Sequence, residues 1–109
     1  MKLLIAVIQN EDSKKLQEVF NKEGIRATKL ATTGGFLRSG NTTFMIGIDD
    51  DKVEDVLNLI AKYCKTRTQT MISSPTYDFN LDAGFDYPID VEVGGATVFI
   101  LPVDAFKKF

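Results

Sequence analysis

The stretch that decides the fold is KLLIAVIQNEDSKKLQEVFNKEG, residues 2–24, in which two kinds of hydrophobic pattern follow each other directly. Lys2–Gln9 is a continuous apolar run with β-branched residues, which is typical of a central strand buried on both faces. After this run, Leu16, Val19 and Phe20 recur at helical spacing with charged residues between them. The chain therefore begins with a strand that leads straight into an amphipathic helix.

Residues that start and stop helices stand at both ends of this helical stretch. Asn10, Asp12 and Ser13 are the candidates for its N-cap, because their side chains can accept a hydrogen bond from a free backbone N–H group. Gly24 is predicted to end the helix, because glycine readily adopts the left-handed conformation that terminates helices.

The next segment predicts two extended stretches around a loop. Ile25–Thr33 is rich in threonine and extended in character, and Gly34–Gly40 has the composition of a loop. Thr42–Ile48 follows as a strand whose alternate side chains share one face. The side chains on that face are Phe44, Ile46 and Ile48.

A second helix is predicted to begin after this strand. Asp51–Glu54 has the spacing of a capping box, with aspartate in place of serine or threonine. An apolar stripe at helical spacing follows it, made of Val53, Val56, Leu57, Ile60 and Cys64. The stripe predicts that Cys64 is a small core residue and not a reactive thiol.

Residues 66–90 interrupt this regular pattern. A connection of this length inside a compact domain is usually functional or mobile, although Thr68–Ile72 has the character of a short strand. The glycine pair Gly94-Gly95 between two alternating runs predicts a hairpin. Ala96–Leu101 is the last strong strand, and at most one helical turn is expected after it.

The predicted order is strand, helix, strand, strand, helix, long loop and strand. It corresponds to a duplicated βαβ arrangement, the ferredoxin-like βαββαβ plan of the α+β class with an antiparallel sheet. A length of 109 residues predicts that residues 1–109 form one domain. Both helices cover one face of such a sheet, so the other face needs a cover, commonly another subunit.

Composition limits the possible functions. The chain has no histidine and one cysteine, which excludes an intrachain disulfide, a metal site built from His and Cys, and a Ser-His or Cys-His nucleophile pair. The formal net charge of -2 argues against a dedicated nucleic-acid binder. The longest apolar run, Leu3–Ile8, is too short to span a bilayer, so we expect no membrane insertion and a cytoplasmic protein.

Residues 24–48, GIRATKLATTGGFLRSGNTTFMIGI, contain no acidic side chain and carry a formal charge of +3. Positive charge, glycine-freed backbone amides, hydroxyls and an aromatic ring together suit a phosphate-bearing aromatic ligand. The same composition also occurs by chance on a strand hairpin. Arg26 in particular has the forked geometry that suits phosphate oxygens, or it is a solvated charge on a strand.

The motifs RATKLATTGGFLRSGNTTF, residues 26–44, and VEVGGATVFILPVDAF, residues 91–106, carry a family resemblance. With them the chain resembles the PII-like cyclic di-AMP receptor proteins of bacteria, from its KLLIAVIQ opening to the terminal FKKF. The resemblance implies a homotrimer of ferredoxin-like subunits without catalytic activity or cofactor. It also implies that cyclic di-AMP binds between subunits and that loops respond to it, so that a downstream protein partner is regulated.

The resemblance further implies a set of ligand contacts in this sequence. They are Arg26, Ala27, Thr28, Gly35, Phe36, Leu37, Asn41, Gly47, Phe99 and Lys108. Physically, Phe36 can stack on adenine and Asn41 can pair with an adenine edge. Gly47 lets a ligand approach a strand closely, whereas Phe99 fits core or interface packing as well as ligand contact. The segment SSPTYDFNLDAGFDYPID, residues 73–90, departs from the glycine- and asparagine-rich family loop, so no contacts are carried over there.

Three other functions remain open on the sequence. One is a PII-like sensor of ATP or ADP, although the loop after the second predicted strand is short for that group. Another is a small ferredoxin-like enzyme that uses carboxylates, against which the lack of histidine counts. The third is a purely structural trimer that binds no nucleotide.

Overall fold

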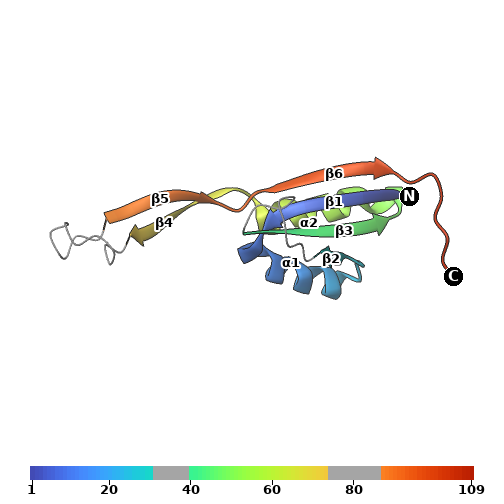
Figure 1. Cartoon of the computed structure of the whole chain (residues 1–109), viewed down its shortest axis with the longest axis horizontal. Coiled ribbons are helices and arrows are strands. Elements are labelled where there is room, and N and C mark those ends of the chain that lie inside the picture. Colours follow the sequence, from blue (N-terminus) through green and yellow to red (C-terminus); the bar gives the residue numbers. More distant parts are fainter. Residues whose placement is uncertain (31–39, 74–86) are drawn as a thin grey trace.

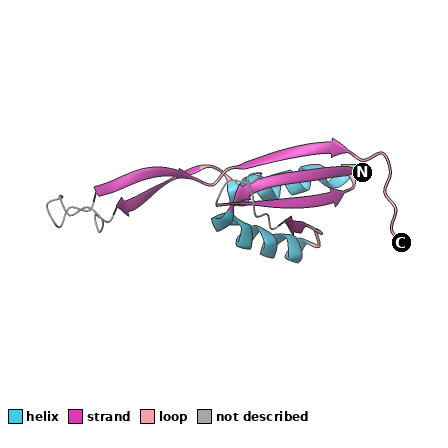
Figure 2. Ribbon diagram, in the orientation of Figure 1, coloured by secondary structure: helices cyan, strands magenta, loops and turns pink. Residues whose placement is uncertain are grey.

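A computed structural model describes residues 1–30, 40–73 and 87–109 of the chain. A four-stranded antiparallel sheet with the order β2-β3-β1-β6 carries two helices on one face (Figure 1 and Figure 2). A separate two-stranded sheet projects from one end of this body. The elements are β1 (Lys2–Gln9), α1 (Asn10–Glu23), β2 (Thr28–Leu30), β3 (Asn41–Ile48), α2 (Val53–Cys64), β4 (Arg67–Ser73), β5 (Tyr87–Val93) and β6 (Ala96–Pro102).

This arrangement confirms the ferredoxin-like plan. β1 lies between β3 and β6 and pairs antiparallel with both, while β2 pairs with the outer edge of β3. β1 and β2 are therefore parallel to each other with β3 between them, as a split βαβ unit requires. The edge strands β2 and β6 are separated by the two central strands, β3 and β1.

The hydrophobic core lies between the sheet and the two helices. Phe20 of α1 meets Phe44 of β3 edge to face, with ring centroids 5.8 Å apart and an interplanar angle of 87°. Each fully buried side chain of this size stabilises the fold by about 1.5–3 kcal/mol. The buried cluster consists of Leu4, Ala6, Ile8, Leu16, Phe20, Phe44, Ile46, Ile48, Val56, Ile60 and Cys64. It confirms the predicted faces of both helices and of the Thr42–Ile48 strand.

The thiol of Cys64 belongs to this core. Burial raises the pKa of Cys64 to about 11, so the thiol is protonated near neutral pH. A buried, protonated thiol packs as a small apolar group, which confirms the structural role that the helical stripe predicts for Cys64.

The end of α1 is where the sequence places it. Gly24 has a φ of 73° and donates its N–H to the carbonyl of Asn21 at 3.3 Å. The N–H of Ile25 then donates to the carbonyl of Phe20 at 2.8 Å, so a left-handed glycine closes the helix and turns the chain toward β2.

The predicted helix caps are wrong at both N-termini. α1 begins at Asn10, so Asn10, Asp12 and Ser13 all lie in its first turn, and the preceding residue makes no side-chain cap hydrogen bond. A 3₁₀ turn, Asp50–Lys52, precedes α2, and no side-chain cap closes either segment, so the capping box at Asp51–Glu54 does not form.

A different partner occupies the acidic run before α2. The carboxylate of Asp50 binds the N-terminal ammonium of Met1 at 2.9 Å. This hydrogen bond lowers the pKa of Asp50 below its usual value. The side chain that ties the start of α2 to the start of β1 is therefore an ion-pair partner and not a helix cap.

The described ends of the segment predicted as a long connection form a paired ribbon. β4 and β5 pair antiparallel from Arg67 opposite Val93 to Ser73 opposite Tyr87, and we call this ribbon the arm. The hydroxyl of Thr70 donates to the carboxylate of its cross-strand partner Asp90 at 2.8 Å. Thr68–Ile72, which the sequence gives as a short strand, lies inside β4.

The hairpin predicted at Gly94-Gly95 is wrong. β5 pairs with β4, and β6 pairs with β1, so the strands on the two sides of the glycine pair do not pair with each other. Both glycines have positive φ, 82° and 90°, and redirect the chain from the arm into the central sheet. The competing long-range pairing with β1 and β4 outweighs the local hairpin signal.

The two glycines Gly94 and Gly24 make a matched pair for a stability test. Both have positive φ, but a Cβ at Gly94 would lie 2.5 Å from Nη1 of Arg67 and 2.7 Å from the carbonyl of Lys65, whereas a Cβ at Gly24 meets nothing within 4 Å. We expect Gly94→Ala to lower the free energy of unfolding by about 2 kcal/mol, and Gly24→Ala by about 1 kcal/mol. Urea titration of both variants measures the difference, and equal losses would contradict the packing at the base of the arm.

Candidate functional site

The register of the sheet decides which predicted residues share a face. Leu4, Ala6 and Ile8 of β1 point into the core between sheet and helices. Side chains alternate along a strand, and directly paired residues of antiparallel strands lie on the same face. The odd-numbered residues of β1, from Leu3 to Gln9, therefore lie on the face without helices, which we call the open face.

Four of the residues predicted as ligand contacts lie on the open face. Thr28 pairs with Met45, Met45 with Ile5, and Ile5 with Phe99, so Thr28 and Phe99 stand in one row across the sheet. Asn41 is opposite Gln9, and Gly47 is opposite Leu3. Thr28, Asn41, Gly47 and Phe99 thus share a face.

These four residues do not converge on one point of a single chain. Thr28 is on the β2 edge and Phe99 on the β6 edge, three strand spacings apart, or about 14 Å. Asn41 and Gly47 are at opposite ends of β3, about 20 Å apart along the strand. A compact ligand cannot touch Thr28 and Phe99 of the same subunit at once.

Arg26 lies where α1 gives way to β2. Its exposed side chain lines a cavity of about 270 Å³ together with Gly47, Asp49 and Lys52. It also lines a shallow depression along the edge of β2, with Ala27 and Thr28. Gly47 is exposed, and a Cβ there would meet nothing within 4 Å, so the backbone of β3 is open to a neighbouring group at this point. Arg26, Thr28 and Gly47 are therefore neighbours at one corner of the sheet.

Ala27 and Lys108 occupy different positions from this corner. The side chain of Ala27 is half-buried and packs against the core beneath the helices. Lys108 is exposed in the C-terminal segment after β6, which runs away from the body of the same chain (Figure 1). Ala27 thus shares with Arg26 only the depression along β2, and Lys108 lines neither that depression nor the cavity at Arg26. Gly35, Phe36 and Leu37 lie outside the described residues.

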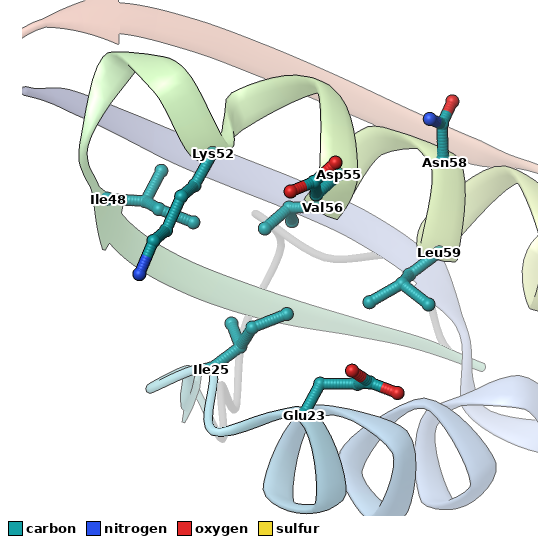
Figure 3. A pocket seen from close by; sticks show the side chains of 8 residues that line it. All are labelled: Glu23, Ile25, Ile48, Lys52, Asp55, Val56, Asn58 and Leu59. Carbon is teal, nitrogen blue, oxygen red and sulfur yellow. The ribbon is translucent and has the colours of Figure 1, made fainter.

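A second cavity adjoins the corner on the helix side. Figure 3 shows this cavity of about 380 Å³ between the end of α1 and α2, with an apolar floor and a charged rim. Ile25, Ile48 and Lys52 line both this cavity and the cavity at Arg26. The residues around it are Glu23, Ile25, Ile48, Lys52, Asp55, Val56, Asn58 and Leu59.

Lys52 is the basic residue that the sequence analysis misses. It stands at the end of an acidic run before α2, where the local pattern gives it no function. Only the folded chain brings Lys52 and Arg26 to the lining of the same cavity. The carboxylates of Glu23 and Asp49 line this cavity as well, so its charges are mixed, and Lys52 offsets part of the negative charge next to Arg26.

Other kinds of site find little support in the described ranges. No group of three or more Cys, Asp or Glu side chains that could hold a metal ion occurs in them. Within the same ranges, no helix has the length and apolar character needed to cross a membrane.

Comparison with known proteins places the chain in a family. A crystal structure of a functionally unknown protein from Pediococcus pentosaceus ATCC 25745 is similar, with a TM-score of 0.76 and 49% sequence identity. The similarity covers 99% of this chain and 96% of that one. A family model described as "Cyclic-di-AMP receptor" matches residues 1–109. Because this match extends over all 109 residues, the chain belongs to the cyclic-di-AMP receptor family.

Proposed function

We propose that the chain is a non-enzymatic, cytoplasmic signalling receptor that binds cyclic di-AMP between the subunits of a homotrimer. Occupancy of the site changes the conformation of the segments around it, and this change regulates a downstream protein. Membership of the cyclic-di-AMP receptor family supports the choice of ligand. The ligand carries two phosphates and two adenines, so the site must offer positive charge and surfaces for flat rings.

The positions of Thr28 and Phe99 on opposite sheet edges carry the subunit-interface part of the proposal. They share the open face but are separated by β3 and β1. If both contact one ligand, Phe99 must come from a neighbouring subunit whose β6 edge approaches the β2 edge of the first. The C-terminal segment with Lys108 leaves its own subunit from the same β6 edge, which is consistent with a contact to the neighbour.

Each residue has a distinct role in this proposal, with Arg26, Lys52 and Gly47 at one end of β3 and Asn41 at the other. The guanidinium of Arg26 binds phosphate oxygens, and Lys52 adds positive charge to the same cavity. The amide of Asn41 pairs with the donor and acceptor on an adenine edge. The bare backbone at Gly47 lets a base lie close to β3. Stacking of Phe36 on adenine and contacts of Gly35 and Leu37 remain predictions from the sequence.

The apolar surface of β6 supports assembly into an oligomer. Phe99, Ile100 and Leu101 are 56%, 47% and 41% exposed on an edge strand of the sheet. An edge strand that exposes large apolar side chains is a typical site of contact with another chain. A trimer that covers the open face would bury Phe99 and Leu101 together with the odd-numbered side chains of β1.

The ligand assignment is tested by calorimetry with the purified protein. We expect submillimolar binding of cyclic di-AMP and much weaker binding of ATP. Arg26→Met and Asn41→Ala should each weaken binding of cyclic di-AMP by about tenfold, because each removes one charge-assisted or bidentate contact.

Matched controls come from α1. Lys22→Met removes a cation from the last turn of α1, and Gln17→Ala removes an amide that binds Asn21 on the same helix, so both should bind cyclic di-AMP within about twofold of the wild type. Equal affinity for cyclic di-AMP and ATP would reject the ligand and favour an ATP sensor. Unchanged affinity for cyclic di-AMP in both Arg26→Met and Asn41→Ala would show that these two residues do not bind the ligand.

The assembly is tested by light scattering on a size-exclusion column. The wild type should elute as a particle of about three times the 12.1 kDa chain mass. Leu101→Lys places a charge on the open face at the β6 edge and should shift the protein to monomers. Ile89→Lys changes a residue of similar exposure on the arm and should leave the trimer intact. A monomeric wild type, or a trimer that survives Leu101→Lys, would contradict the assembly.

A further inference from the structure

The arm has little support of its own. Its two strands pair with each other, and the described side chains along its outer length are exposed on both strands, at residues 68–70 and 88–90. A two-stranded ribbon alone is at best marginally stable in water. The orientation of the arm therefore depends on the contacts at its base, where β4 begins at Arg67 and β5 ends at Val93.

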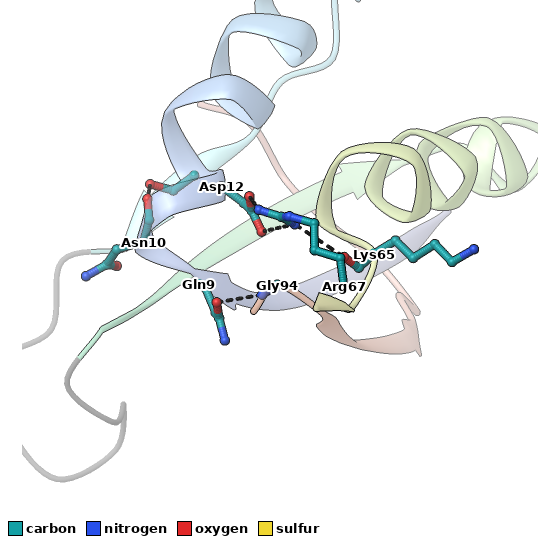
Figure 4. A network of polar contacts seen from close by, with 7 residues as sticks. Gln9, Asn10, Asp12, Lys65, Arg67 and Gly94 are labelled. Atoms are coloured by element: carbon teal, nitrogen blue, oxygen red, sulfur yellow. Dashed lines mark hydrogen bonds and ion pairs between the residues drawn. The ribbon is translucent and has the colours of Figure 1, made fainter. Parts of the chain in front are cut away.

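The strongest of these contacts joins Arg67 to the first turn of α1. Figure 4 shows the guanidinium of Arg67 facing the carboxylate of Asp12, with Nη2 at 2.8 Å from Oδ1 and Nη1 at 3.3 Å from Oδ2. The side chain of Asp12 is only 8% exposed, so this carboxylate depends on its partner for compensation of its charge. The hydrogen bond to Asp12 raises the pKa of Arg67 above its usual value.

The last carbonyls of α2 also bind the base of the arm. Nη1 of Arg67 donates to the carbonyl of Lys65 at 3.3 Å, and the N–H of Gly95 donates to the carbonyl of Cys64. The final carbonyls of a helix have no partner within the helix and carry the negative end of its dipole. Arg67 thus donates both to a carbonyl at the end of α2 and to a carboxylate in the first turn of α1.

A third contact leads from the arm to the strand that carries Asn41. The N–H of Gly94 donates to Oε1 of Gln9 at 2.7 Å (Figure 4). Gln9 is the cross-strand partner of Asn41, and both lie on the open face. Gln9 therefore binds the base of the arm through its side chain and pairs through its strand with Asn41, the position predicted to bind ligand.

The next residue strengthens the same connection. The N–H of Asn10 donates to the carbonyl of Gly40 at 2.7 Å, and Oδ1 of Asn10 accepts a hydrogen bond from the hydroxyl of Thr42. Both residues that flank Asn41 are thus bound to Asn10. Movement of Gly40, Asn41 or Thr42 would act directly on the junction of β1 and α1.

We propose that the junction of β1 and α1, formed by Gln9, Asn10 and Asp12, is a latch. It couples the end of β3 that carries Asn41 to the orientation of the arm. Gln9 and Asn10 sense the position of Gly40–Thr42, while Gln9 and Asp12 hold Gly94 and Arg67. Occupancy at Asn41 favours the arm position in which these contacts are closed. The size of the effect equals the difference in ligand affinity between the closed and open states.

The ligand half of this inference rests on the proposed function, whereas the anchoring half does not. We therefore test them separately by amide hydrogen exchange in β4 and β5, first without ligand. Arg67→Met should increase exchange at residues 67–69 and 91–93 by about tenfold or more, with exchange in β1 and β3 unchanged. Lys65→Met removes a neighbouring charge but keeps the carbonyl that Arg67 binds, so it should stay within about twofold of the wild type.

Exchange with cyclic di-AMP then tests the coupling. In the wild type, the ligand should slow exchange at the base of the arm. In Arg67→Met this slowing should disappear, although the affinity for cyclic di-AMP falls by no more than about threefold because Arg67 lies outside the ligand corner. Asp12→Asn keeps the shape of the carboxylate without its charge and should show the same loss in weaker form, which provides a second variant if Arg67→Met is poorly folded.

The outcomes are distinguishable. Unchanged arm exchange in both variants without ligand would overturn the latch, whatever the protein binds. Ligand binding that leaves arm exchange unaltered in the wild type would overturn the coupling but leave the receptor function intact. If cyclic di-AMP does not bind at all, the proposed function and the coupling both fail, and faster arm exchange in Arg67→Met would still support the anchor.

Discussion

The antiparallel register of β1 with β3 and β6 is the constraint on which the rest of this structure depends. It sends Leu4, Ala6 and Ile8 into the core and leaves the odd-numbered side chains of β1 on the open face. Because the period of a strand is two, a slip of one residue would exchange the two faces completely. The helices bury one face, and this burial fixes the register.

The same register positions the residues that are predicted to contact a ligand. Thr28, Asn41, Gly47 and Phe99 come from three strands, yet pairing places all four on the open face. Thr28 and Phe99 are nevertheless on opposite edges of the sheet, too far apart to contact one compact ligand within a single chain. In the proposed assembly, a half-site at the β2 edge is completed by the β6 edge of a second copy of the chain. Among the described residues, no pocket gathers all the predicted contacts.

Local pattern in the sequence was sufficient for the body of the fold. The apolar run at Lys2–Gln9, the helical stripes and the left-handed Gly24 each appear as predicted, because burial and glycine conformation act over a few residues. The glycine pair Gly94-Gly95 misled the prediction because its short-range hairpin signal competes with pairing between strands distant in sequence. At α1, the predicted cap residue Asp12 is likewise drawn into a long-range contact, an ion pair with Arg67, 55 residues away.

The candidate site was accessible from sequence mainly through the family resemblance. Composition indicated an anionic ligand near Arg26 but could not place Lys52 at the same cavity, because the end of α1, the end of β3 and the turn before α2 meet there only in the folded chain. No sequence signal indicated the latch roles of Gln9 and Asp12, and Asp12 was predicted only as a candidate helix cap. Their roles depend on contacts with Gly94 and Arg67, which no periodicity reveals.

The most direct measurement of the central claim is a crystal structure of the protein with cyclic di-AMP. The account predicts ligand density between two subunits, with phosphate oxygens near Arg26 and Lys52 of one subunit and a base between Gly47 of that subunit and Phe99 of its neighbour. An empty interface with ligand bound elsewhere, or a ligand enclosed by a single subunit away from Arg26, would contradict it.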